Sequence, residues 1–119
     1  MNSHKDLNVW KKAINFVSDV YKMTENFPNS ELFGLTNQIR RAAVSIPSNI
    51  AEGAARTSQK EFNQFLSIAL GSRAEVETQL LIALNLKFIS TETYKELTIK
   101  IDDIRKMLIE LKKSLKSNE

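Results

Sequence analysis

Few residues of this chain have the types and spacing that catalysis or metal binding requires. The sequence holds one histidine, His4, and no cysteine, so it lacks the ligands of a structural or catalytic zinc site. Di-iron bundle proteins use Glu-x-x-His motifs, and the chain contains none. A Ser-His-Asp arrangement would depend entirely on His4. We therefore expect neither a metal nor a cofactor.

Glu52 and Glu75 are the remaining candidates for acid–base chemistry, because two neighbouring carboxylates shift each other's pKa. An enzyme of this kind requires both carboxylates to be shielded from solvent and to lie within about 10 Å of each other. The simpler interpretation is that each accepts ordinary hydrogen bonds from its neighbours. We accordingly expect a protein that is not an enzyme.

Polar residues also fall on or beside the apolar stripes of two neighbouring predicted helices, where buried polar groups need partners. We predict a cross-helix network made of Gln38, Asn49, Glu52, Ser72 and Glu75. The simpler interpretation is that this network fixes the register between the two helices. The alternative is a ligand site.

Basic residues surround the same region. Guanidinium groups match the geometry of phosphate. We therefore predict a phosphate-binding surface that consists of Arg40, Arg41, Arg56, Lys60 and Arg73. The alternative is that these side chains pair with nearby carboxylates. No aromatic residue is interleaved with them, so stacking of single-stranded bases gains no support.

Pro47 lies well inside a predicted helix, where proline costs about 3 kcal/mol. It should bend the helix and free the carbonyl group of Ala43. Small residues on both sides of it, among them Ser48 and Ala51, leave one face of the helix thin. A thin face allows close packing within the chain or forms a subunit interface.

Four amphipathic patterns cover most of the 119 residues. Apolar residues at spacings of three and four predict helices over about 7–26, 31–55, 58–87 and 91–116, and short connections favour antiparallel neighbours. A second apolar set in the third helix predicts that this helix is the most enclosed; its members are Ile68, Leu70, Leu81 and Ile82. The predicted fold class is all-α, an up-down four-helix bundle forming a single domain over 1–119.

Charge and hydropathy bear on whether the protein binds nucleic acid or a membrane. A net charge of +3, from 17 basic and 14 acidic residues, permits nucleic-acid binding without requiring it. No apolar run approaches the ~20 residues of a membrane span, and the N-terminus lacks the apolar core of a signal peptide. We therefore expect a cytoplasmic protein with no membrane partner. The absence of cysteine fits the reducing cytoplasm but is weak evidence for it.

Several motifs occur together along the first three predicted helices. They are Asp6-Leu7 with Val9-Trp10-Lys11, Phe27-Pro28, Gln38-Ile39-Arg40-Arg41-Ala42-Ala43 and Ser45-Ile46-Pro47-Ser48-Asn49-Ile50-Ala51-Glu52-Gly53, followed by Ser58, Glu61-Phe62, Phe65-Leu66, Gly71-Ser72 and Glu75. In these motifs the chain resembles the four-helix-bundle proteins first noticed in intervening sequences of bacterial 23S ribosomal RNA genes. The fourth predicted helix matches that family only as a heptad pattern.

The resemblance implies a four-helix protomer that assembles into a ring-shaped homopentamer and is not an enzyme. A related protein, the accessory variability protein of diversity-generating retroelements, is similar in fold and forms a strongly basic pentameric barrel that binds nucleic acid and a reverse transcriptase. The present chain is only mildly basic. We expect an oligomeric accessory protein that binds RNA or DNA through a basic surface of the ring; the alternative is a protein-interaction scaffold that recruits a protein partner and has no nucleic-acid role.

Overall fold

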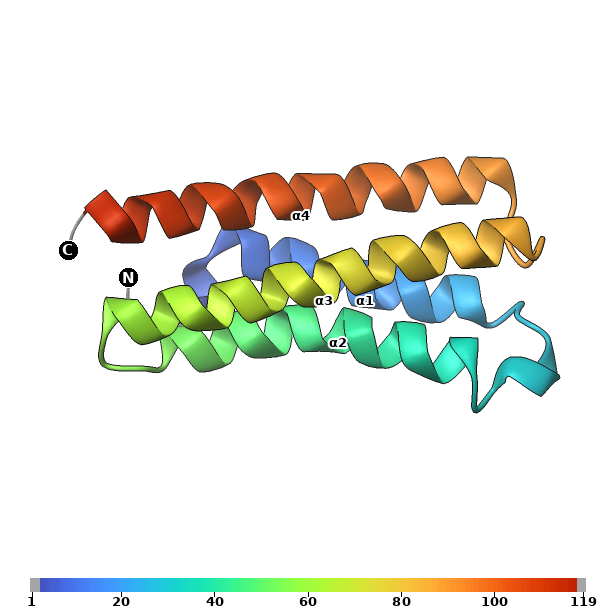
Figure 1. The fold of residues 1–119 in the computed structure, drawn as a ribbon, viewed down its shortest axis with the longest axis horizontal. Helices are drawn as coiled ribbons and strands as arrows, with labels where there is room; N and C mark the ends of the chain where they lie inside the picture. The colour runs from blue at the N-terminus through green and yellow to red at the C-terminus, as the bar shows by residue number, and fades with distance from the viewer. Residues whose placement is uncertain (1–2, 118–119) are drawn as a thin grey trace.

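The computed structural model describes residues 3–117, with side chains up to Leu115. Four α-helices make up most of this part of the chain: α1 (Asn8–Thr24), α2 (Leu35–Ala54), α3 (Gln59–Asn85) and α4 (Thr91–Ser117). Two short 3-10 helices, His4–Asp6 and Asn29–Glu31, precede α1 and α2. The helices run up and down side by side (Figure 1), and no strand occurs within residues 3–117.

The helix boundaries follow from local hydrogen bonds. The Ser58 hydroxyl accepts a hydrogen bond from the backbone N–H of Glu61 at 3.1 Å and caps α3. The Ser90 hydroxyl accepts one from the N–H of Thr93 at 3.1 Å at the start of α4. The second helix, which the sequence placed from about Glu31 or a few residues later, begins at Leu35, because the segment Asn29–Glu31 forms a separate 3-10 turn. A carboxylate oxygen of Glu31 then accepts from the N–H of Leu35 at 3.1 Å.

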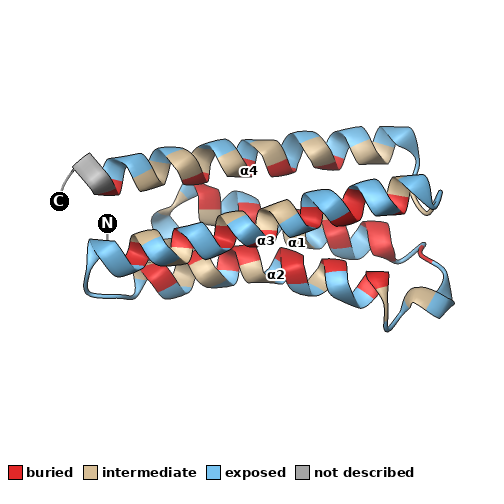
Figure 2. Ribbon diagram, viewed as in Figure 1, coloured by how far each residue is buried: buried red, intermediate tan, exposed pale blue. Residues whose placement is uncertain are grey.

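Each helix packs against its two neighbours, whereas no Cα atoms of the diagonal pairs α1/α3 and α2/α4 lie within 8 Å of each other in the described part of the chain. Buried residues line the inward side of every helix (Figure 2). The buried residues of α4 include Leu97, Ile101, Ile104 and Leu108 at spacings of four, three and four, as the heptad pattern predicted. The predicted all-α arrangement of four helices is confirmed.

The prediction that α3 is the most enclosed helix is wrong. Ile68, Leu81 and Ile82 are between 41% and 50% exposed, while Leu70 is half-buried. The core of α3 is instead a single stripe that runs from Phe62 to Ala83. Three of the four residues therefore lie largely on the outside of the protomer, while Leu70 packs against the edge of the core.

The tightest helix contact joins the end of α2 to the start of α3. A Cβ atom placed on Gly53 would lie 2.6 Å from Cβ of Phe65 and 2.9 Å from Cδ1 of Phe62. Only glycine fits at such a separation, because real Cβ atoms do not approach that closely. Gly53 thus sets how near α2 and α3 lie at this end of the bundle.

No helix within residues 3–117 is long and apolar enough to cross a lipid bilayer.

Candidate functional site

The polar network between α2 and α3 centres on a residue that the sequence did not single out. The Ser45 and Ser72 hydroxyl oxygens lie 2.8 Å apart. The Asn49 side-chain amide donates to both the Ser45 hydroxyl and the Ser45 carbonyl oxygen, each at 2.8 Å. Ser45 precedes Asn49 by one helical turn, and this spacing was the available signal for it. The network therefore ties α2 to the buried Ser72 of α3.

The other three predicted members do not join these hydrogen bonds. Gln38 and Glu75 line a shallow recess of about 280 Å³ beside Ser45 and Ser72; within residues 3–115 neither side chain forms a hydrogen bond or an ion pair. Glu52 has a side chain that is 59% exposed and lies 3.9 Å from Arg56. The structure thus unites Asn49 and Ser72 but leaves Gln38, Glu52 and Glu75 at the surface.

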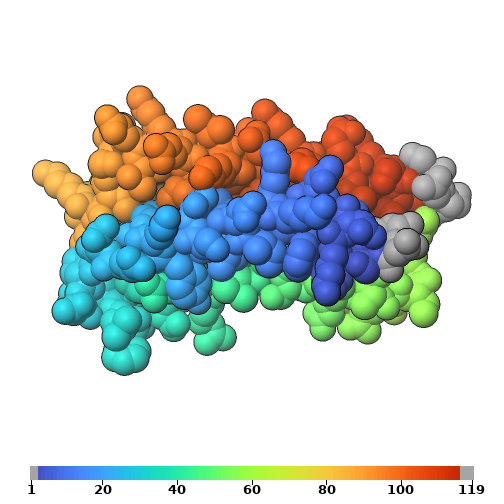
Figure 3. Space-filling view, turned by 180° about the vertical axis from the view of Figure 1, so that it is seen from behind, coloured from blue at the N-terminus to red at the C-terminus, as the bar shows by residue number. Residues whose placement is uncertain are grey.

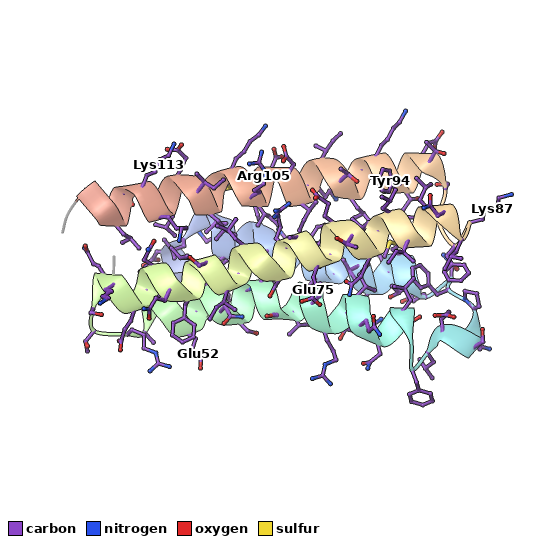
Figure 4. All side chains as sticks on the ribbon, in the orientation of Figure 1. Glu52, Glu75, Lys87, Tyr94, Arg105 and Lys113 are labelled. Atoms are coloured by element: carbon purple, nitrogen blue, oxygen red, sulfur yellow. The ribbon has the colours of Figure 1, made fainter. Side chains whose placement is uncertain are left out.

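Glu52 and Glu75 do not form a catalytic pair. Glu75 lines the same recess as Ala42, and ten residues of helix separate Ala42 from Glu52, which amounts to about 15 Å. Both carboxylates are exposed, and Figure 4 shows them at different points along the bundle. This separation exceeds the spacing of known two-carboxylate sites.

Arg40 serves the contact between α1 and α2. Its Nε donates to the Thr24 hydroxyl oxygen at 2.7 Å, and Nη2 donates to the carbonyl oxygen of Tyr21 at 3.5 Å. The guanidinium carbon lies 4.6 Å from the centre of the Tyr21 ring, a distance typical of a cation–π contact. These contacts hold the guanidinium group against α1.

Arg73 is also engaged within the protomer. Its side chain is only 12% exposed, and Nη1 lies 3.1 Å from a carboxylate oxygen of Glu77, one turn further along α3. Its Nε atom is buried and has no hydrogen-bond partner in the described part of the chain. Little of this guanidinium group is open to an external phosphate.

Arg41, Arg56 and Lys60 remain exposed. Arg41 borders the α2/α3 recess, whereas Arg56 and Lys60 lie at the turn between the two helices, about 20 Å further along α2. The Arg56 guanidinium carbon lies 4.9 Å from the centre of the Phe65 ring. The five predicted phosphate-binding residues thus divide into two that are engaged within the protomer and three that face solvent.

A separate apolar groove runs between α1 and α2. It has a volume of about 360 Å³ and is lined mainly by Trp10, Ile14, Val17, Val44, Pro47 and Ala51. Figure 3 shows this side of the molecule, with α1 across the middle and α2 below it. The helix continues through Pro47 without a break, and the proline ring lies in the wall of the groove. The thin face expected around Pro47 is therefore part of a hollow surface.

The Asp102 carboxyl group on α4 has a shifted pKa. Hydrogen bonding to Arg105, at 2.8 Å, holds the pKa of Asp102 below its usual value, and Lys106 at 3.3 Å adds to the effect. This is a surface ion-pair cluster of helical neighbours. In addition, no three His, Cys, Asp or Glu side chains within the described part of the chain are placed to hold a metal ion.

Comparison with known proteins identifies a family and similar solved structures. The sequence model of the 23S rRNA-intervening sequence protein family matches residues 5–110. The chain is 28% identical to a protein of unknown function from the S23 ribosomal protein family of Bacteroides thetaiotaomicron VPI-5482, with a TM-score of 0.82; the match covers 88% of this chain and 95% of that one. No curated protein sequence gives a match. Because the family model spans nearly all of the bundle, this chain belongs to the family of 23S rRNA-intervening sequence proteins.

Proposed function

We propose that this chain is a non-enzymatic accessory protein of the cytoplasm that assembles into a ring of five identical subunits and binds RNA or DNA. The observation that carries the binding is the exposure of Arg41 on α2, Arg56 in the turn that follows it and Lys60 in the first turn of α3. Among the described residues only one carboxylate, Glu52 at 3.9 Å from Arg56, pairs with any of the three. Exposed guanidinium and ammonium groups of this kind bind phosphate oxygens.

Assembly into a ring would strengthen the binding of nucleic acid by these basic groups. A single chain carries a net charge of only +3, whereas a ring of five would carry about +15 and repeat each basic group five times. Repetition also raises the effective concentration of the second and later contacts once the first has formed. A mildly basic chain can bind nucleic acid in this way without a strongly basic sequence.

The test is a binding titration with labelled single-stranded RNA and double-stranded DNA over a range of salt concentrations. We expect affinity to fall steeply with salt, because binding releases condensed counterions. Replacing Arg41, Arg56 and Lys60 by glutamine should flatten the slope by about 0.7–0.9 for each phosphate group that the protein no longer neutralises. Absence of binding at low salt would refute the nucleic-acid role.

A matched control separates local contacts from net charge. Lys87, Lys95 and Lys106 are exposed on and before α4, and replacing them by glutamine removes the same three charges. We expect this control to bind nearly as well as the unaltered protein. If both triple variants weaken binding equally, the three proposed residues have no special part in it.

A second candidate function is a scaffold that recruits another protein. Phe33, in the turn before α2, is 91% exposed, and its neighbour Leu32 is 50% exposed. Exposed aromatic side chains are characteristic anchors of protein interfaces. Capture of a defined partner that survives nuclease treatment and is lost in Phe33→Ala would favour this function over nucleic-acid binding.

A further inference from the structure

The outer face of α3 carries two partly exposed isoleucines in line with a glutamate. Ile68 and Ile82 are 50% and 41% exposed, and Glu75 stands midway between them at intervals of seven residues. Residues seven apart on a helix lie along one line, the spacing by which helices pack against one another. A line of this kind is the side that a helix presents to another helix.

Gly71 lies beside this line in the middle of a helix of 27 residues. A Cβ atom placed on it would meet no atom within 4 Å, so nothing inside the protomer requires glycine there. Glycine in a helix interior is destabilising relative to alanine, but it allows another backbone to approach closely. Gly71, Ala74 and Thr78 line one shallow recess of about 510 Å³ between α3 and Gln38 of α2.

Gln79 lines the same recess and points to a missing partner. The residue is only 7% exposed, and its Oε1 atom is buried with no hydrogen-bond donor within residues 3–115. Buried amide oxygens nearly always accept a hydrogen bond. A donor supplied by a molecule that covers the recess would satisfy this oxygen.

The α1/α2 groove has the complementary shape. Trp10, Ile14, Val17 and Tyr21 follow one another along α1 at spacings of four, three and four, and Ile14, Tyr21 and Val44 are 39–42% exposed. This is an apolar hollow lined by two helices, whereas α3 presents the exposed Ile68 and Ile82 on either side of Glu75. A helix seats in the hollow between two others.

Unpaired charges on the two faces have opposite signs. Lys11 lies seven residues before Ser18, which lines the groove, so it flanks the groove on α1, whereas Lys22 lines a recess between α1 and α4. Neither lysine forms an ion pair within the described residues, and neither does Glu75. Contact between the faces would bring a lysine of one copy to the glutamate of another.

We infer that α3 of one copy of this chain packs into the α1/α2 groove of a second copy. The interface joins two different surfaces, which we name the α3 ridge (Ile68, Gly71, Glu75, Thr78, Gln79 and Ile82) and the α1/α2 groove (Trp10, Ile14, Val17, Val44, Pro47 and Ala51). An interface between unlike surfaces repeats from subunit to subunit and forms a closed ring when the rotation closes. The inference rests on the proposed ring and assigns its contact surfaces.

The two contact surfaces lie on adjacent sides of the bundle, on either side of α2. Figures 1 and 3 view the bundle from opposite sides and show α3 in front in one and α1 in front in the other. The α3 ridge and the α1/α2 groove both border α2, since residues of α2 line both recesses. The outer face of α2, with Arg41, would then face the ring axis.

Two double variants test the pairing by solution mass. Ile68→Asp/Ile82→Asp damages only the ridge, and Ile14→Asp/Val44→Asp damages only the groove; all four side chains are already exposed in the protomer, so both variants should fold. Each variant alone should be monomeric, and an equimolar mixture should form a dimer through its one intact ridge and one intact groove. The control Ile99→Asp, at a position on α4 that is 63% exposed, should assemble normally.

Cysteine cross-linking provides a second readout, because the chain contains no cysteine. The double variant Ile14→Cys/Ile82→Cys should form a ladder of disulfide-linked chains, whereas each single cysteine variant should stay uncross-linked. Cross-linking of a single variant would mean that like surfaces meet and would overturn the inference. Normal assembly of either aspartate variant would overturn it while leaving the ring intact. A monomeric unaltered protein would overturn the ring as well.

Discussion

Two glycines of this protein predict opposite responses to the same substitution. Gly71→Ala adds a methyl group where no atom lies within 4 Å, whereas Gly53→Ala adds one at 2.6 Å from Cβ of Phe65. The chemical change is identical, and both positions are helical. The pair therefore isolates packing from helix propensity.

The magnitudes follow from these distances. Gly71→Ala should stabilise the isolated protomer by about 0.5–1 kcal/mol, because alanine loses less backbone freedom in a helix and here displaces nothing. Unfolding entropies near 2 cal/mol/K per residue convert this to a rise in Tm of roughly 2–4 °C for a domain of this length. Gly53→Ala should cost about 1–3 kcal/mol, since Cβ of Phe65 is fixed by the backbone of α3 and the two helices must move apart.

Urea denaturation followed by circular dichroism measures both changes, at a dilution where light scattering reports single protomers. Assembly should respond differently from protomer stability at this position. The larger substitution Gly71→Leu should leave the protomer folded but prevent close approach of a second copy. A loss of protomer stability in Gly71→Ala would refute the open environment assigned to that position. A neutral Gly53→Ala would refute the close contact of α2 with α3.

Three further substitutions test individual contacts. Ser45→Ala should cost about 1–3 kcal/mol in urea denaturation, because it leaves a buried hydroxyl group of α3 without a partner; the exposed Ser48→Ala should stay within about 0.5 kcal/mol of the unaltered protein. Arg40→Ala should cost about 1–3 kcal/mol of stability, because it removes the hydrogen bond and the cation–π interaction with α1. Its exposed neighbour provides the control Arg41→Ala. An equally small loss of stability in both variants would contradict the contacts of Arg40 with α1. The lowered pKa of Asp102 means that its ion pairs stabilise the fold above the ordinary carboxyl pKa and lose this effect as the pH falls through the lowered value. Asp102→Asn should therefore be less stable than the unaltered protein at neutral pH and equally stable in strong acid, and a deficit that persists at low pH would contradict this.

The sequence was sufficient for the helices because their core stripes are long and regular. The heptad pattern of α4 leads directly to its buried residues, and Ser58 marks the start of α3 by capping it. The start of α2 was left open between Glu31 and a few residues later because of Gly34, and it lies at Leu35, after Asn29–Glu31 has formed a 3-10 turn. Local pattern does not distinguish such a turn from the first turn of an α-helix.

The surfaces were harder to predict because apolar residues serve folding and assembly alike. Ile68, Leu81 and Ile82 were assigned to an enclosed helix, yet they are exposed in the protomer, and periodicity alone does not separate the two cases. The sequence also did not predict which basic side chains face solvent and which pack against a neighbouring helix. Whether Arg40 faces solvent or Tyr21 depends on how α1 and α2 are rotated about their axes, which tertiary packing decides.

Native mass spectrometry of the unaltered protein with a short RNA at low salt tests the central proposal most directly. The account predicts a complex of five chains, each of 13.6 kDa, with RNA bound. The Ile68→Asp/Ile82→Asp variant in the same experiment should give single chains with little or no bound RNA. A single chain without RNA from the unaltered protein would contradict the account.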